Sequence, residues 1–325
     1  ARLSQVAWTW QTGSMRHLFL AAVAASLAIP SHAQQAEPPA PGEIVAAAPD
    51  EAWIAIAPTD LLVMDLAPDA KGQPRRVIIQ LMPAPFSQGW IDNIRKLAAA
   101  HWWDGTAVTR VQDNYVAQWG DPTEAKPLPE GLTVVPESEY VVDAKTAAGW
   151  SAARAMRVSA SVTADPYAPS QALWGWPIAH GENGEIWPVH CYAMVGVGRN
   201  MSPDTGSGAE LYTVIGHAPR HLDRNIALVG RVVSGIEHLS SLPRGTGPLG
   251  VYERAEERVP ILSIRLASDL PAVQRPRFEY LSTESESFAR YADARANRRD
   301  AFFIRPAGGA DICNIPIPIR PTAQK

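Results

Sequence analysis

Several features that mark other functional classes are missing from this sequence. It has no Lys/Arg-rich run, and its formal net charge of −4 disfavours binding to a phosphate backbone. It has no His-Glu-x-x-His motif, and Pro219 between His217 and His221 argues against a helical pair of metal ligands. We therefore expect no nucleic-acid partner and no metal site at these histidines.

Motifs for covalent catalysis and dinucleotide binding are incomplete. Ser207 lies between glycines, but no strand-to-helix elbow surrounds it, as a hydrolase nucleophile would require. Gly196 and Gly198 do not lie in the strand–helix–strand context of a dinucleotide site. A secreted hydrolase is an alternative hypothesis that no credible nucleophile–base pair supports.

Cysteine is nearly absent, because Cys191 and Cys313 are the only two. In an exported protein they could pair, and closing so long a loop would stabilise the fold by about 4–5 kcal/mol on the chain-entropy model. The alternative is two buried free thiols, since strand-like sequence flanks Cys191. Sequence alone does not show whether the two side chains meet, so both possibilities stay open.

The N-terminal residues have the pattern of an export signal. Residues 1–14 precede the first methionine and are interpreted as an upstream extension. Residues 15–33 resemble a secretory signal peptide, with Arg16 before an apolar run at 18–29 and a small-x-small cleavage site ending at Ala33. The apolar run is too short to span a bilayer, and no cysteine for lipid attachment follows the site. We expect a periplasmic or secreted protein with no membrane anchor after cleavage.

The rest of the chain is predicted to form one β-rich domain with extensions. Apolar residues make up 46% of the sequence, enough for a sizeable core, and the 29 prolines cluster between elements. We predict a disordered Ala/Pro/Glu-rich lead-in at 34–50, a main domain at 51–270 and a C-terminal extension at 271–325. Residues 122–188 are interpreted as a long, irregular insertion. Single helices are predicted near 145–157 in the insertion and 285–303 in the extension.

Hydrophobic periodicity predicts the elements of the main domain. Strands are expected at 61–66, 76–81, 108–111, 115–117 and 259–266, with further strands between 189 and 233 and a short helix at 235–242. An amphipathic helix should begin near Ser87, because five apolar residues recur on one face. These residues are Trp90, Ile91, Ile94, Leu97 and Ala98.

The most informative segment is residues 103–122, which read as two short strands joined by a turn. Arg110 lies mid-strand among apolar neighbours, where a guanidinium is costly unless it faces a pocket. The second strand contains an aromatic-x-x-Gln-x-Gly-Asp run from Tyr115 to Asp121. This combination resembles the signature of the cyclophilin-type peptidyl-prolyl isomerases, in which the strand arginine is catalytic.

The resemblance implies a closed eight-stranded antiparallel β-barrel capped by two helices, and it assigns the site residues. Arg110 aligns with the catalytic arginine, and Gln118 with the glutamine that orients it. Further positions align with substrate-binding residues of the family. These are Tyr115, Val116, Tyr212 and Leu222 in the proline pocket, Gly196 on the peptide backbone, and Glu210 where the family has glutamine.

Three positions near the motif depart from the family pattern. Thr109 stands in place of a histidine before the arginine, His221 replaces a tryptophan, and Ile226 replaces a pocket histidine. These changes motivate an alternative function, a peptide-binding or chaperone module with weak or no isomerase activity. The resemblance itself implies isomerisation of X-Pro bonds in exported polypeptides by a monomer that needs no cofactor or metal.

Overall fold

The computed structural model describes residues 37–143, 145 and 165–322. The predicted upstream extension at 1–14 and signal peptide at 15–33 lie outside these residues. Within the described part of the chain, no helix is both long and apolar enough to cross a membrane.

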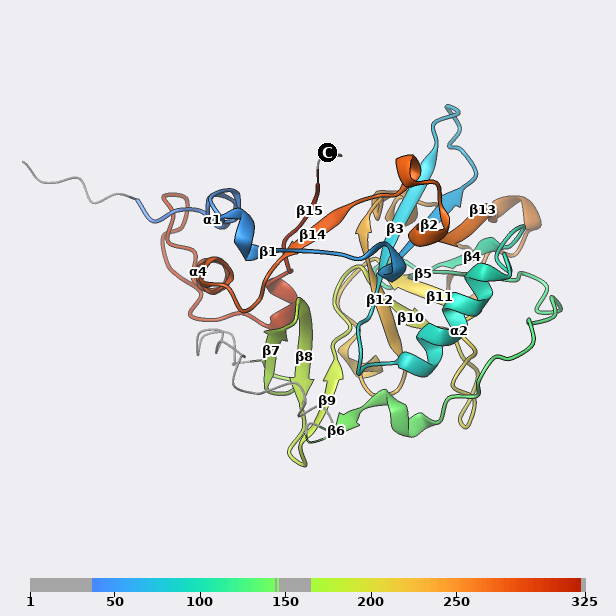
Figure 1. The fold of residues 1–325 in the computed structure, drawn as a ribbon, viewed down its shortest axis with the longest axis horizontal. Helices are drawn as coiled ribbons and strands as arrows, with labels where there is room; N and C mark the ends of the chain where they lie inside the picture. Colours follow the sequence, from blue (N-terminus) through green and yellow to red (C-terminus); the bar gives the residue numbers. More distant parts are fainter. Residues whose placement is uncertain (1–36, 144, 146–164, 323–325) are drawn as a thin grey trace, which may run out of the picture. The chain divides into compact units, whose positions relative to one another are not determined.

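Eight antiparallel strands close into a barrel, which confirms the predicted fold class (Figure 1). Their order around the barrel is β10-β11-β5-β4-β13-β2-β3-β12, so three of the neighbouring pairs, β2-β3, β4-β5 and β10-β11, are consecutive in the sequence. The strands are β2 (Leu61–Leu66), β3 (Arg75–Leu81), β4 (Ala107–Val111), β5 (Val116–Gly120), β10 (Met194–Val197), β11 (Leu211–Val214), β12 (Leu228–Ser234) and β13 (Val259–Leu266).

Strand β2 shows why the barrel strands read as almost continuous apolar runs. Leu62 and Met64 belong to the main hydrophobic core, whereas the alternate residues Leu61 and Val63 belong to a second cluster that includes Phe278. Because side chains alternate across a strand, the C-terminal extension covers the face of β2 that points away from the main core. This strand is therefore buried on both faces.

The amphipathic helix is confirmed as α2 (Gln88–Ala99), and its apolar stripe is buried. The side chains of Trp90, Ile91, Ile94 and Leu97 are fully buried in the main core. A short helix, α3 (Glu237–Ser240), follows β12 within the predicted range.

The insertion is not irregular as predicted, because it forms a second antiparallel sheet. The sheet has the order β6-β9-β8-β7, built from β6 (Val142–Asp143), β7 (Ser170–Leu173), β8 (Trp176–His180) and β9 (Glu185–Pro188). Pro177 and Pro188 lie inside or at the end of these short strands and hide the alternation on which strand prediction depends. Apart from residue 145, the helix predicted at 145–157 lies outside the described residues.

The predicted disorder at 34–50 is wrong for the described residues of its second half. Helix α1 (Pro41–Ala46) begins with a proline at its first turn, buries Ile44 and packs beside α4 (Glu286–Ala296). Helix α4 confirms the predicted helix of the extension, but it ends at Ala296 instead of continuing to 303. Its N-terminus is capped by Ser285, whose side chain accepts a hydrogen bond from the Phe288 N–H.

The two ends of the described chain share a third sheet, in which β1 (Trp53–Ala55), β14 (Phe278–Leu281) and β15 (Ile319–Pro321) lie in that order.

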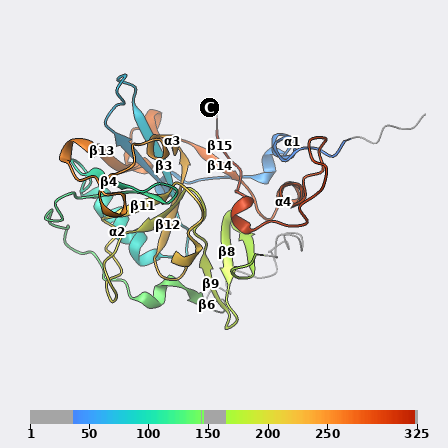
Figure 2. The ribbon, with the colours of Figure 1, turned by 180° about the vertical axis from the view of Figure 1, so that it is seen from behind.

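Cys191 and Cys313 form a disulfide with a Cα–Cα distance of 5.1 Å, which decides the question that the sequence left open. The bond fastens the C-terminal extension to the segment between the insertion and the barrel. Figure 2 shows the same elements from behind.

Short 3-10 helices lie within the connections between these elements. They span Asp50–Ala52, Pro58–Asp60, Glu137–Tyr140, Arg220–Leu222, Pro248–Gly250, Ala255–Glu257, Ala267–Asp269, Ala272–Gln274 and Ile312–Asn314.

Candidate active site

Four of the predicted site residues form one row across four neighbouring barrel strands. Arg110 on β4 lies opposite Gln118 on β5, and Gln118 lies opposite Tyr212 on β11. Tyr212 in turn lies opposite Gly196 on β10. Residues directly opposite each other in antiparallel strands share a face of the sheet. The register therefore brings together residues that are more than a hundred positions apart in sequence.

The Arg110 guanidinium is held by three neutral acceptors. Its Nη1 donates to Gln118 Oε1 at 2.9 Å, its Nε donates to the Leu249 carbonyl at 2.6 Å, and its Nη2 donates to the Gln112 side chain. Burial lowers the pKa of Arg110, and the nearby Tyr115 and Glu210 oppose that shift. The result is a fixed, half-buried cation with no carboxylate in direct contact among the described residues.

Gln118 joins Arg110 to Glu210. Its amide oxygen accepts from Arg110, and its Nε2 donates to a carboxylate oxygen of Glu210. These two bonds set the orientation of the amide, because the oxygen must face the guanidinium and the nitrogen must face the carboxylate. Gln118 is therefore hydrogen-bonded on one side to Arg110 and on the other to Glu210.

An apolar cluster lies beside the guanidinium and is separate from the main core. Its buried members are Val116, Tyr212 and Val214, and its partly buried members are Tyr115, Leu222 and Ile226. The cluster thus brings together all four residues predicted to line the proline pocket. Arg110 Cζ lies 5.6 Å from the centroid of the Tyr115 ring, so the charge borders this cluster. The ring of His221 stacks on that of Tyr115, with the two ring centroids 6.2 Å apart.

Gly196 is required by the ring of Tyr212. A Cβ atom at this position would overlap the Tyr212 hydroxyl and ring. Because Gly196 has no side chain, the Tyr212 ring can lie against the backbone of β10, where it is a buried member of the apolar cluster.

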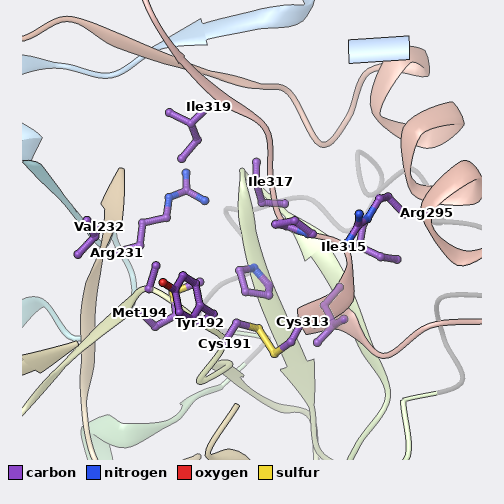
Figure 3. Close-up of a pocket in the computed structure, with 14 residues that line it drawn as sticks. Cys191, Tyr192, Met194, Arg231, Val232, Arg295, Cys313, Ile315, Ile317 and Ile319 are labelled. Carbon is purple, nitrogen blue, oxygen red and sulfur yellow. A yellow bond between two sulfur atoms is a disulfide. The ribbon is translucent and has the colours of Figure 1, made fainter. Parts of the chain in front are cut away.

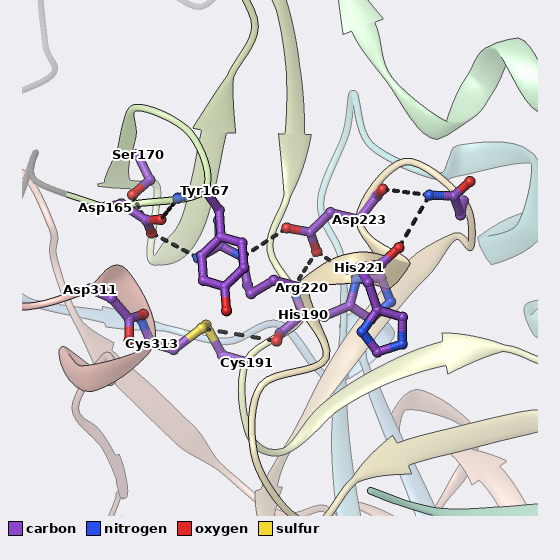
Figure 4. A network of polar contacts seen from close by, with 11 residues as sticks. Asp165, Tyr167, Ser170, His190, Cys191, Arg220, His221, Asp223, Asp311 and Cys313 are labelled. Atoms are coloured by element: carbon purple, nitrogen blue, oxygen red, sulfur yellow. Dashed lines mark hydrogen bonds and ion pairs between the residues drawn. A yellow bond between two sulfur atoms is a disulfide. The ribbon is translucent and has the colours of Figure 1, made fainter.

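Sequence analysis did not find the polar network behind Tyr212 (Figure 4). His190 is fully buried; its Nε2 lies 2.9 Å from Tyr212 Oη and its Nδ1 lies 2.8 Å from Asp223 Oδ1. Arg220 Nε donates to the second oxygen of Asp223 at 2.9 Å, and its Nη1 donates to Asp165 Oδ2 at 2.8 Å. The network therefore extends from Tyr212 on β11 to Asp165, which lies just before β7 of the inserted sheet.

The charges in this network compensate one another. Burial raises the pKa of Asp165, but hydrogen bonds from Arg220, the Tyr167 N–H and Ser170 outweigh it and hold that pKa below its usual range. Burial raises the pKa of Tyr212 well above its usual value, so its hydroxyl stays protonated. One sequence signal for this network was available. Tyr212 stands where the family has phenylalanine, and a buried tyrosine hydroxyl needs a hydrogen-bond partner, so a polar residue next to it could have been predicted.

Comparisons with known proteins agree with this geometry. A family model described as cyclophilin-type peptidyl-prolyl cis-trans isomerase matches residues 77–266. Among solved structures, cyclophilin AquaCyp293 from Hirschia baltica is similar with a TM-score of 0.61 and 21% identity, covering 84% of this chain and 94% of its own. That likeness supports the fold. The search of curated proteins found no match.

Two structures of a Cryptosporidium parvum cyclophilin-type isomerase are more distant. One, obtained in the presence of the dipeptide Ala-Pro, has a TM-score of 0.37 and 10% identity, covering 63% of this chain and 98% of its own. The other has a TM-score of 0.38 and 11% identity, covering 64% and 96%.

Proposed function

This chain belongs to the cyclophilin-type peptidyl-prolyl cis-trans isomerase family, and we propose that Arg110 carries its isomerase activity at the row of residues described above. The fold and the family make the protein a peptidyl-prolyl cis-trans isomerase. The proposal concerns the mechanism and the substrates.

Rotation about an X-Pro bond is slow because the nitrogen lone pair is delocalised into the carbonyl, which gives a barrier of about 18–20 kcal/mol. No covalent bond has to break. A catalyst has to bind the twisted amide more tightly than either planar form. It needs an apolar slot for the proline ring and a donor aimed at the nitrogen, whose lone pair becomes available as the bond twists.

The Arg110 site meets both needs. The partly buried members of the cluster, Tyr115, Leu222 and Ile226, offer an apolar surface for the ring above the buried Val116 and Tyr212, and the guanidinium of Arg110 lies at its border. An N–H of Arg110 donates to the proline nitrogen in the twisted state, and Gln118 keeps the guanidinium in place. Arginine suits this role because its donors are rigid and its charge persists at neutral pH. The single observation that carries the proposal is this juxtaposition of a fixed cation and a separate apolar cluster.

A protease-coupled assay on an X-Pro peptide tests the proposal. Arg110→Ala should lose most of kcat/KM, whereas Arg76→Ala, a change at an exposed strand arginine paired with Asp65, should keep it. Peptide binding by Arg110→Ala is measured in parallel. Equal rates for wild type and Arg110→Ala, with peptide still bound, would support the alternative of a binding or chaperone module.

We further propose that the substrates are proline-containing segments of exported polypeptides and that the protein acts in the periplasm or outside the cell. The signal-like pattern at 15–33 supports this, and so does the disulfide, because disulfides persist in oxidising compartments. Cell fractionation combined with thiol alkylation tests it. Recovery of the protein with the cytoplasmic fraction and with reactive cysteines would contradict it.

A further inference from the structure

A cavity lies away from the Arg110 row, where the C-terminal extension meets the barrel (Figure 3). Its volume is about 260 Å³. One side is formed by β10 and β12, and the other by residues 312–319 of the extension. The disulfide between Cys191 and Cys313 forms part of its wall and holds the two sides together.

The lining of this cavity is mostly apolar, and its only charged members are arginines. Ile312, Ile315, Ile317 and Ile319 supply the extension side. Arg231 and Arg295 also line the cavity, and none of its lining residues is acidic. A cavity of this kind suits a ligand with an apolar body and a negative end.

Arg231 is a buried cation whose charge no carboxylate of the described residues neutralises. Its side chain is only 5% exposed, and in Figure 3 the guanidinium extends from β12 toward Ile319. Nε and Nη2 donate to Gln80 Oε1, and Nη1 donates to the Gly175 carbonyl, both neutral acceptors. Within the described part of the chain, no Asp or Glu forms an ion pair with it. Burial lowers the pKa of Arg231 to about 9, so the charge is still present at neutral pH.

The same protein shows how a buried arginine is ordinarily compensated. Arg220 is also 5% exposed, and it forms ion pairs with both Asp165 and Asp223. Arg231 has instead the ring of Trp176, whose centroid lies 4.1 Å from its Cζ. A cation–π contact offsets part of the cost of burying a charge, but less than a carboxylate does. Arg231 therefore has unused capacity to bind an anion.

The number of free donors restricts the anion. A guanidinium has five N–H groups, and three of those of Arg231 are already used. One N–H on Nη1 and one on Nη2 remain, and two donors are the number that the two oxygens of a carboxylate can accept. A phosphate dianion would bring a further oxygen and a second negative charge, which Arg231 alone could not satisfy, and Arg295, the other arginine of the lining, already donates to the Asn314 carbonyl.

We propose that this cavity binds an aliphatic monocarboxylate, with its carboxylate on Arg231 and its chain against the isoleucines of the extension. The cavity is at the small end of ligand-binding pockets, so a chain of about eight carbons fits better than a long fatty acid. This inference does not depend on the isomerase site, because none of its residues belongs to the Arg110 row or the apolar cluster beside it.

Isothermal titration calorimetry of the full protein with octanoate, 1-octanol and octylamine tests the proposal without any substitution. Octanoate should bind at one site, at least tenfold more tightly than the alcohol, and octylamine should not bind there. Equal affinity for octanoate and octanol would overturn the proposal, and so would the absence of octanoate binding at millimolar concentration.

Matched arginine variants locate the carboxylate. Arg231→Met keeps an unbranched apolar stem but removes the guanidinium, and it should weaken octanoate binding at least tenfold. Arg295→Met removes the half-exposed arginine of the same cavity, which donates to the Asn314 carbonyl, and should change affinity less than threefold. Thermal unfolding of each variant verifies that it folds. If Arg231→Met unfolds, Ile317→Trp, which fills the cavity from the extension side, should abolish binding, and unchanged binding would contradict the proposal.

Discussion

The hydroxyl of Tyr212 lies 2.9 Å from Nε2 of His190, which links the apolar cluster beside Arg110 to a fully buried histidine. A carboxylate only accepts hydrogen bonds, so His190 Nδ1 is the donor to Asp223. The Tyr212 hydroxyl is thus held by a hydrogen-bonded network that starts at His190. The network continues through Asp223 and Arg220 to Asp165.

Replacing Tyr212 with phenylalanine removes only the hydroxyl. Isomerase activity should be largely retained, because the ring that forms the wall remains. Stability should fall by about 1–3 kcal/mol, since a buried ring nitrogen loses its partner. Urea unfolding measures the loss. A variant as stable as the wild type would show that the bond to His190 contributes nothing to folding.

Asp165→Asn should be among the more damaging single changes in the insertion. It leaves Arg220 buried with one carboxylate instead of two, and breaking a buried ion pair costs about 3–5 kcal/mol. Asp113→Asn is the matched control, because Asp113 pairs with Arg244 on the surface and its loss should cost less than about 1 kcal/mol. Chemical denaturation compares the two. Similar losses would contradict a special role for the buried network.

Acid should destabilise the protein through Asp165. Its folded-state pKa lies below the ordinary value of 3.8, so the unfolded state takes up the proton first as the pH falls. The stabilisation is therefore complete well above pH 4 and is lost progressively as the pH drops through the folded-state pKa. Urea midpoints between pH 3 and 7 measure this. The slope in Asp165→Asn should be shallower than in the wild type, and an equal slope would assign the acid sensitivity to other carboxylates.

Gly196→Ala should disturb the pocket by displacing Tyr212. The added methyl group overlaps the tyrosine ring, and overpacking of this kind costs about 1–3 kcal/mol. We expect a higher KM for the X-Pro peptide together with lower stability. Gly42→Ala in α1 is the control, because its Cβ would meet nothing within 4 Å and alanine favours a helix. A Gly196→Ala enzyme with unchanged KM would argue against Tyr212 as a substrate-contacting wall.

The barrel and the Arg110 row were predictable because their signals are local. Strands such as Leu61–Leu66 are continuous apolar runs, and the segment around Arg110 carries its arginine, aromatic residue and glutamine within nine positions. Register then places Tyr212 and Gly196 beside them.

The remaining features depend on contacts between residues that are distant in sequence. His190 and Asp223 are 33 residues apart, and no local pattern relates them. The strands of the insertion are short and contain prolines such as Pro177, so their alternation is hidden. Helix α1 has six residues and gains its stability from packing Ile44 near α4, which an Ala/Pro-rich composition does not reveal.

The residues matched by the family model begin at 77 and end at 266, yet the folding unit is larger on both sides. A chain shortened to that range would lack β2, one of the eight strands of the barrel. It would also lack Phe278, so Ile78 on the outer face of β3 would lose its apolar cover. It would also lack Cys313, so Cys191 would be left as a free thiol. The apolar surface beside it, which the isoleucines of the extension cover in the full chain, would be exposed. Recombinant production of this enzyme therefore requires the chain from the N-terminal helix through β15, expressed where cysteines oxidise.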